Sequence, residues 1–299
     1  MRRFLGIALA GLLLLAVAAG FTALALRPPE GVDARRARIA ELAQAGVAKG
    51  DWPGLMWAEV APGRIVALGA AGFADIAGAR DMTPDTIMPI GSISKVIVGL
   101  AGAQAIHAGA LDPDAPLTGF LSLDVAWPDD LARSFTHLAT HSAGVLDSDA
   151  GYEAVGYHFG SSTHPMALED FLAAYLTEGG ALYDAGENFA AWPPGHRYAY
   201  SNIGPGLAAR AIADATGEAF AAYSARVLAP LGLSGGWGHL GPPGAEAATL
   251  YARTDTDAFE ALPPYGLATW PDGQYTASAR DLAKLLATVM GDNASKANN

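Results

Sequence analysis

The stretch that decides the fold reads Gly91-Ser92-Ile93-Ser94-Lys95, and an apolar, alanine-rich segment follows it. The pattern predicts a buried helix over residues 92–107. Residues three apart share one face of a helix, so the side chains of Ser92 and Lys95 can meet. A serine in the first helical turn also lies near free backbone N–H groups, which favour negative charge that develops there. The stretch therefore predicts a serine and a lysine held together at the start of a buried helix.

This S-x-x-K spacing has a chemical interpretation and a structural one. Burial in an apolar helix disfavours the charged form of a lysine, so a neutral Lys95 amine could accept the proton of Ser92 and activate it as a nucleophile. The chain contains only four lysines and thirteen serines. With these numbers the spacing arises by chance with a probability of roughly one in six. A serine that caps the helix, beside a lysine that reaches solvent, explains the spacing equally well.

A second polar pattern is Tyr198-Ala199-Tyr200-Ser201-Asn202, which follows Pro194-Gly195 and precedes a predicted helix over 205–215. A tyrosine hydroxyl close to a lysine ammonium can shuttle protons, and an asparagine amide can orient a substrate carbonyl. Tyr200 and Asn202 are therefore further candidates for the site. The alternative interpretation is that both side chains only close a turn.

The remaining periodicity predicts strands near the start of the chain and a mostly helical middle. Two strand-like runs, 55–60 and 64–68, are joined by Pro62-Gly63, which indicates a hairpin. Helices are predicted over 33–49, 167–176, 218–228 and 279–290. The glycine-rich stretch 232–236 matches a G-x-S-x-G nucleophile elbow, but the patterns on either side of it favour a tight turn.

The N-terminus predicts export. Arg2 and Arg3 precede an uninterrupted apolar run, Phe4–Leu26, which is long enough to cross a bilayer as a helix. This run is either an uncleaved signal-anchor or a removed signal peptide, and in both cases the positive-inside rule places the rest of the chain outside the cytoplasm. We expect a single-pass membrane protein with a periplasmic or extracellular catalytic domain, or a periplasmic or secreted protein if cleaved. The expected organisation is a cytoplasmic N-terminus at 1–3, the apolar segment at 4–26, a linker at 27–35 and one domain at 36–299.

Composition excludes several classes of protein. The 299 residues are 51% hydrophobic and 16% charged, with a formal net charge of -12 and no cysteine. So acidic a chain lacks the basic surface that nucleic acids require, and we expect no nucleic-acid partner. The absence of cysteine excludes a disulfide scaffold, a cysteine nucleophile, cysteine-ligated zinc and a lipidated cysteine anchor. The seven histidines form no H-E-x-x-H motif, so we expect no metal site. Gly204-Pro205-Gly206 is similar to a dinucleotide-binding fingerprint but lacks the acidic residue expected further on, and we expect no organic cofactor.

Together these patterns resemble the serine β-lactamase and penicillin-binding-protein superfamily, in particular its class C β-lactamase-related branch. The resembling segments keep the family's order over about residues 36–290; they are Thr83–Thr86, Ile90–Lys95, Leu138–Gly144, Pro194-Gly195, Tyr200–Asn202, Pro230–Leu233 and Ser278–Leu282. Carried over residue by residue, the resemblance implies that Ser92 is the acylating nucleophile and Lys95 its proton acceptor. It makes Tyr200 the general acid and base, Asn202 a substrate-binding amide and His141 a structural residue.

The resemblance also implies a fold and an activity. The fold is expected to be α/β (α+β) of the β-lactamase/transpeptidase type, with an antiparallel sheet and flanking helices beside a helical lobe, and a cleft between them. The expected reaction is hydrolysis of an amide, β-lactam or ester through an acyl-serine intermediate, on a small-molecule or peptide substrate such as a β-lactam, a D-amino-acid peptide or an ester. The alternative is a membrane-anchored, non-catalytic or sensor-type penicillin-binding pseudoenzyme. The oligomeric state stays open.

The chain departs from the family pattern after the second motif. Relatives carry a third motif, K-T-G or H-x-G, on an edge strand of the cleft, and no K-T-G occurs here. His239-Leu240-Gly241 has the letters of H-x-G but lies within the predicted helical lobe. By family order, later sheet strands and a C-terminal helix should follow the helix at 279–290. We therefore expect the domain at 36–299 to be C-terminally truncated and to lack the late strands. Such a domain should be poorly stable and weakly active or inactive, unless a partner chain supplies the missing strands.

Overall fold

The computed structural model of this chain describes residues 31–153, 155–238 and 247–296. Two features singled out in the sequence, the apolar segment Phe4–Leu26 and the H-x-G letters at 239–241, lie outside the described residues. The chain divides into two units, Met1–Trp52 and Pro53–Asn299. All the segments that resemble a known family from Thr83 onward belong to the second unit.

The described part of the first unit is dominated by the helix α2, Val32–Lys49, which confirms the helix predicted over 33–49. Gly50 ends it with a φ of 76°, in the left-handed region that glycine adopts without strain. Beyond it, the N–H of Asp51 donates to the carbonyl of Gly46 at 2.9 Å. Gly46 also leaves room for the ring of Trp52, where a β-carbon would clash.

The second unit begins with the predicted hairpin. Strand β1, Gly54–Ala61, pairs antiparallel with β2, Arg64–Asp75, and the register runs from Gly54 opposite Gly72 to Ala61 opposite Arg64. The short β3, Arg80–Asp81, completes a sheet in the order β1-β2-β3. Gly63 turns the chain with a φ of 71°, as the Pro-Gly signal predicts. The second strand is longer than its apolar run because it continues through small residues at 69–72.

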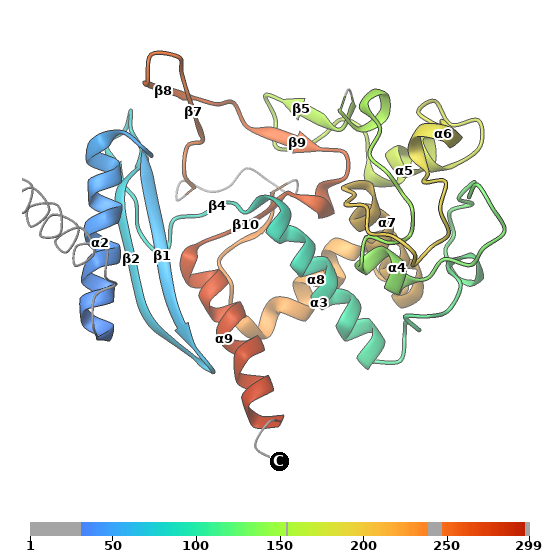
Figure 1. Ribbon diagram of the computed structural model, residues 1–299, viewed down its shortest axis with the longest axis horizontal. Helices are drawn as coiled ribbons and strands as arrows, with labels where there is room; N and C mark the ends of the chain where they lie inside the picture. The colour runs from blue at the N-terminus through green and yellow to red at the C-terminus, as the bar shows by residue number, and fades with distance from the viewer. Residues whose placement is uncertain (1–30, 154, 239–246, 297–299) are drawn as a thin grey trace, which may run out of the picture. The chain divides into compact units, whose positions relative to one another are not determined.

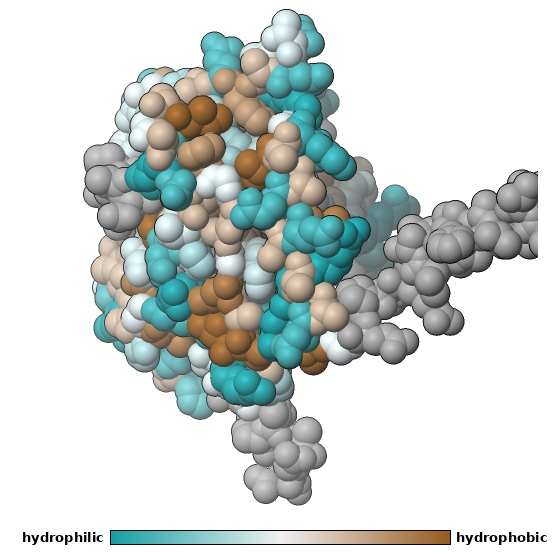
Figure 2. Space-filling model, turned by 90° about the vertical axis from the view of Figure 1, so that its left-hand side faces the viewer, coloured by the Kyte–Doolittle hydropathy of each residue, from teal (hydrophilic) through white to brown (hydrophobic). Residues whose placement is uncertain are grey.

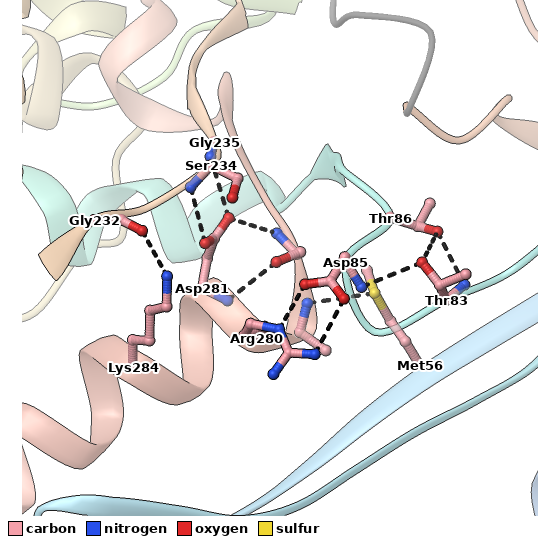
Figure 3. Close-up of polar contacts among 12 residues, drawn as sticks. Met56, Thr83, Asp85, Thr86, Gly232, Ser234, Gly235, Arg280, Asp281 and Lys284 are labelled. Atoms are coloured by element: carbon pink, nitrogen blue, oxygen red, sulfur yellow. Dashed lines mark hydrogen bonds and ion pairs between the residues drawn. The ribbon is translucent and has the colours of Figure 1, made fainter.

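Helix α9, Ala279–Lys296, packs against β1 and β2 (Figure 1). Its first turn is fixed by a reciprocal cap, in which Ser278 Oγ accepts from the N–H of Asp281 at 3.1 Å and Asp281 Oδ2 accepts from the N–H of Ser278 at 3.2 Å. The same carboxylate accepts the backbone N–H groups of Ser234 at 2.9 Å and Gly235 at 3.1 Å (Figure 3). Asp281 therefore joins the start of α9 to the turn that precedes strand β6, Gly236–Trp237.

The helical part of the second unit is built around α7 (Figure 1). Its helices are α3 Ser94–His107, α4 Phe135–Ala139, α5 Leu168–Leu176, α6 Ala185–Asn188, α7 Ile203–Thr216 and α8 Phe220–Leu228. Helix α7 contacts α3, α4, α5 and α8, and its Ile203, Leu207 and Ile212 are fully buried. The helices predicted for this region are confirmed as α3, α5, α7 and α8, and each contributes buried apolar side chains to this core.

Short strands and turns connect these helices. The strands are β4 Met88–Pro89, β5 Tyr157–Phe159, β6 Gly236–Trp237, β7 Tyr251–Arg253, β8 Phe259–Ala261, β9 Tyr265–Leu267 and β10 Tyr275–Ala277. They form a three-stranded sheet in the order β4-β10-β6 and the antiparallel pairs β5-β9 and β7-β8. The single-turn segments are η1 Gly91–Ile93, η2 Leu117–Gly119, η3 Asp149–Glu153, η4 Ala229–Leu231 and η6 Trp270–Asp272. The stretch 232–236 is the predicted turn, since Gly232 ends η4 with a φ of 56° and β6 follows.

On the face shown in Figure 2, hydrophobic patches are interspersed with hydrophilic residues. Within the three described ranges, no helix has the combination of length and hydrophobicity that a membrane span requires.

Candidate active site

The turn η1 and the start of α3 present the predicted serine and lysine together. Ser92 lies in the single turn η1 and is exposed, and α3 proper begins at Ser94. Gly91 enters this turn with a φ of 52°, in the left-handed region that favours glycine. The buried Ser94 Oγ accepts the N–H of Tyr275 at 3.0 Å, which fastens the start of α3 to β10. The predicted helix therefore starts two residues later than expected, with the serine in the turn that leads into it.

Lys95 occupies the centre of the site. Its Nζ lies 3.1 Å from Ser92 Oγ, 2.8 Å from Asn202 Oδ1 and 2.9 Å from the carbonyl oxygen of Asp272. These three acceptors match the three donors of an ammonium group. A neutral amine would keep two of the contacts as a donor and receive the proton of Ser92 at the third. The site therefore suits a lysine that exchanges one proton with the serine.

Tyr200 approaches the same serine oxygen from the loop before α7. Its hydroxyl donates to Ser92 Oγ at 2.7 Å, and its ring centre lies 4.9 Å from Lys95 Nζ. The ring stacks on that of His141, with 4.7 Å between ring centres and 27° between planes. Two proton-carrying groups thus converge on one hydroxyl, which is the arrangement that nucleophilic catalysis by serine requires.

His141 supports this loop. Its Nδ1 accepts the N–H of Ser201 at 3.1 Å, and its backbone adopts a φ of 53°, which is uncommon outside glycine. Burial lowers the pKa of His141, and the nearby charge of Lys95 lowers it further against the opposing effect of Asp147. The imidazole is therefore held neutral at neutral pH, which suits the acceptor role that its Nδ1 plays.

Asp147 is a residue of the site that sequence reasoning missed. Its carboxylate accepts Ser201 Oγ at 2.9 Å, the N–H of Asn202 at 2.8 Å and the N–H of Ile203 at 3.1 Å, at the start of α7. It also accepts Asn202 Nδ2 at 2.9 Å. Because the amide nitrogen of Asn202 is committed to Asp147, its oxygen is left to face Lys95. No local motif marks Asp147, since its partners are about 55 residues away in sequence.

Asp272 is the second residue that the sequence did not reveal. It ends η6, and Trp270-Pro271-Asp272-Gly273 is typical of an ordinary turn. Its carboxyl is buried, and burial raises its pKa to about 7 against the opposing influence of Lys95. The Oδ2 atom accepts Tyr152 OH at 2.9 Å and Thr269 Oγ1 at 3.0 Å.

The histidines and acids do not gather into a metal centre in the part of the chain that the structure describes. His137, four residues before His141, instead accepts the N–H of Ser134 through its Nδ1 at 3.1 Å, as part of the cap of α4.

Comparisons with known proteins place this chain in a family. Residues 39–299 match the family model described as Beta-lactamase. A β-lactamase of Escherichia coli (strain K12) is 29% identical over 199 residues, which are 64% of this chain and 45% of that protein. The esterase EstB of Burkholderia gladioli is 31% identical over 180 residues, 57% of this chain and 43% of the esterase.

Among solved structures, the octameric penicillin-binding protein homologue from Pyrococcus abyssi superposes with a TM-score of 0.68 at 24% identity. The superposition covers 84% of this chain and 55% of that one. This likeness confirms the fold predicted from the sequence. The matches span less than half the length of both curated relatives (45% and 43%).

Proposed function

This chain belongs to the beta-lactamase family, and we propose that it hydrolyses an amide, β-lactam or ester through an acyl-Ser92 intermediate. The observation that carries the proposal is the convergence of Lys95 Nζ and Tyr200 OH on Ser92 Oγ, at 3.1 and 2.7 Å. A capping serine with a solvent-reaching lysine needs no tyrosine at this distance. The geometry therefore favours the chemical interpretation of the S-x-x-K spacing over the structural one.

In the proposed reaction, Ser92 Oγ attacks the substrate carbonyl while its proton passes to Lys95. The backbone N–H of Ser92 is one expected donor to the oxyanion that forms. Collapse of the tetrahedral intermediate breaks the bond to the leaving group, which takes a proton from Tyr200. Water then attacks the acyl-serine and gives a proton back to Tyr200. When the second intermediate collapses, the bond between Ser92 Oγ and the acyl carbon breaks, and Lys95 returns its proton to Ser92 Oγ. Asn202 orients Lys95 through its amide oxygen, at 2.8 Å. Its amide nitrogen donates one N–H to Asp147, and the second N–H is the donor proposed for the substrate carbonyl.

The substrate class rests on similarity. One relative is named a β-lactamase and another an esterase, and both names denote acyl transfer to water. A small acyl compound of this kind is the proposed substrate. The exposed position of Ser92 and the half-buried position of Lys95 agree with a nucleophile open to such a molecule.

Labelling tests this proposal. The protein is treated with a fluorescent penicillin and with a fluorophosphonate, and the adduct is mapped by mass spectrometry. We expect both probes on Ser92, with loss of label in Ser92→Ala and its retention in Ser94→Ala, provided that circular dichroism shows both variants folded. Lys95→Ala should slow acylation on the order of 10²-fold or more. Labelling that survives unchanged in Ser92→Ala overturns the proposal, and a stoichiometric burst without turnover indicates the sensor-type alternative.

We also propose that the catalytic part is exported. The support is the arginine pair followed by the apolar run Phe4–Leu26. Alkaline phosphatase fused after residue 40 should be active in this case. Activity confined to a cytoplasmic reporter at the same point would contradict export.

A further inference from the structure

Asp272 is a buried acid that has no part in the proposed reaction, yet it contacts Lys95, the proposed proton acceptor. The main-chain carbonyl of Asp272 accepts a hydrogen bond from Lys95 Nζ at 2.9 Å, and only 2% of Asp272 is exposed. We propose that Asp272 is a positioning residue whose carboxyl sets the pH at which the group formed by Ser92, Lys95 and Tyr200 takes up and releases its proton. The inference rests on the proposed function and assigns a residue that governs it.

The two oxygens of this carboxyl have unequal surroundings. Oδ2 accepts hydrogen bonds from Tyr152 OH and Thr269 Oγ1. Oδ1 is buried and has no hydrogen-bond partner within the described part of the chain. A carboxylate with one unsatisfied oxygen is costly in a protein interior. Whether Asp272 ionises is therefore decided by the charges that face it.

Those charges come from several elements. Burial raises the pKa of Asp272 to about 7, the charge of Lys95 on α3 opposes this rise, and the like charge of Asp147 adds to it. The phenols of Tyr152 on η3 and Tyr265 on β9 also face the carboxyl and have raised pKa values, for which burial is the main cause. Because Lys95 Nζ contacts the main-chain carbonyl of the same residue at 2.9 Å, an ionised Asp272 carboxyl and an ammonium group on Lys95 lie close enough to attract each other.

This coupling has a direction that can be measured. An ionised Asp272 should make the group formed by Ser92, Lys95 and Tyr200 keep its proton to higher pH, so the proton acceptor beside Ser92 becomes available later as the pH rises. An amide at this position cannot ionise. The acid limb is the part of the pH profile in which the acylation rate rises with pH. In Asp272→Asn this limb should therefore move to lower pH, by roughly one pH unit.

The primary experiment measures the acylation burst with p-nitrophenyl butyrate from pH 5 to 9 in the wild-type protein and in Asp272→Asn. The matched control is Asp281→Asn, which alters an equally buried acid (1% exposed) that caps α9 away from the site. We expect the acid limb to shift in Asp272→Asn alone. Tyr152→Phe removes one donor from Oδ2, favours the neutral carboxyl and should shift the limb in the same direction, by less.

A second measurement does not depend on activity. The chain has only four lysines, so protein grown with ¹³Cε-lysine gives few signals, and the signal lost in Lys95→Ala identifies Lys95. Its titration should move to lower pH in Asp272→Asn and stay unchanged in Asp281→Asn. If the wild-type protein shows no burst, the proposed function fails while this titration still tests the coupling. An unchanged Lys95 titration in Asp272→Asn overturns the inference, whatever the burst shows.

Discussion

Asp147 orders the loop that carries Tyr200 and Asn202, although it touches neither Ser92 nor Lys95 in the hydrogen-bond network. One carboxylate satisfies backbone donors at the start of α7 and the side chains of Ser201 and Asn202. Free N–H groups at a helix start are usually capped by the residue just before the helix. Here the cap comes from a distant segment. The carboxylate of Asp147 therefore fixes both the start of α7 and the side chain of Asn202, whose oxygen accepts the hydrogen bond from Lys95.

Replacing Asp147 by asparagine tests this role. The new amide nitrogen faces backbone donors, so at least one N–H loses its acceptor and the Asn202 amide loses its anchor. A buried donor without a partner costs about 1–3 kcal/mol. We expect acylation of Ser92 to slow by about tenfold or more, measured as burst rate. Asp214→Asn is the control, since Asp214 pairs with Arg210 at the far end of α7. Equal slowing in both variants would contradict a specific role for Asp147.

At the residue scale, the sequence predicts the site residues that belong to a recognisable motif and misses the site residues that do not. Ser92 and Lys95 are adjacent on one helical turn, so their contact follows from spacing alone. The approach of Tyr200 depends on a pairing 108 residues apart in sequence, and only the family resemblance could suggest it. Asp147 and Asp272 occupy turns of ordinary composition, and their roles arise from tertiary contacts.

At the element scale, two neighbouring acidic contacts at the start of α9 should differ in strength. Asp281 is buried and accepts three backbone N–H groups, whereas the ion pair of Arg280 Nε with Asp85 Oδ1, at 2.6 Å, is solvent-exposed (Figure 3). Exposed pairs contribute about 0–1 kcal/mol, while a lost buried cap costs about 1–3 kcal/mol.

We therefore expect Asp281→Ala to lower the free energy of unfolding by about 2 kcal/mol or more, and Arg280→Ala to change it by less than about 1 kcal/mol. Urea unfolding followed by tryptophan fluorescence measures both. A larger loss in Arg280→Ala than in Asp281→Ala would show that the exposed pair, and not the cap, holds the start of α9.

Element prediction succeeds where the apolar face is long and fails where strands are short. α5, α7 and α8 come from long apolar runs, and all their predicted ends lie within two residues of the observed ones. Strands such as β4, β6 and β10 have two or three residues, too few to show an alternating pattern. Their pairing is decided by the segments around them, which periodicity does not report.

At the scale of the whole second unit, segments far apart in the sequence are tied together in pairs. Ser94 on α3 holds Tyr275 on β10, Lys95 holds Asn202, and Arg280 holds Asp85. These contacts explain why the order of the family segments predicts the fold when local periodicity does not. Each segment supplies one residue of a contact, and the partner residue lies in a segment far away in the sequence.

The buried carboxyl of Asp272 also makes the stability of this unit depend on pH. Its pKa rises from an ordinary 3.8 to about 7 in the folded protein. Below pH 4 the carboxyl is protonated in both states and contributes no difference. Between pH 4 and 7 the unfolded chain releases the proton while the folded protein keeps it, so the free energy of unfolding falls as the pH rises. The fall has an upper limit of about 4 kcal/mol.

Asp272→Asn removes this titration, so the free energy of unfolding of the wild-type protein minus that of the variant should decrease from pH 4 to pH 8 and then level off. Urea unfolding of both proteins across this range, at constant ionic strength, gives the difference directly. Titrating groups that are not coupled to Asp272 cancel in the subtraction, because the two chains share them. A difference that stays constant with pH would mean that Asp272 ionises in the folded protein at its ordinary pH, and that its burial is compensated by the ammonium of Lys95.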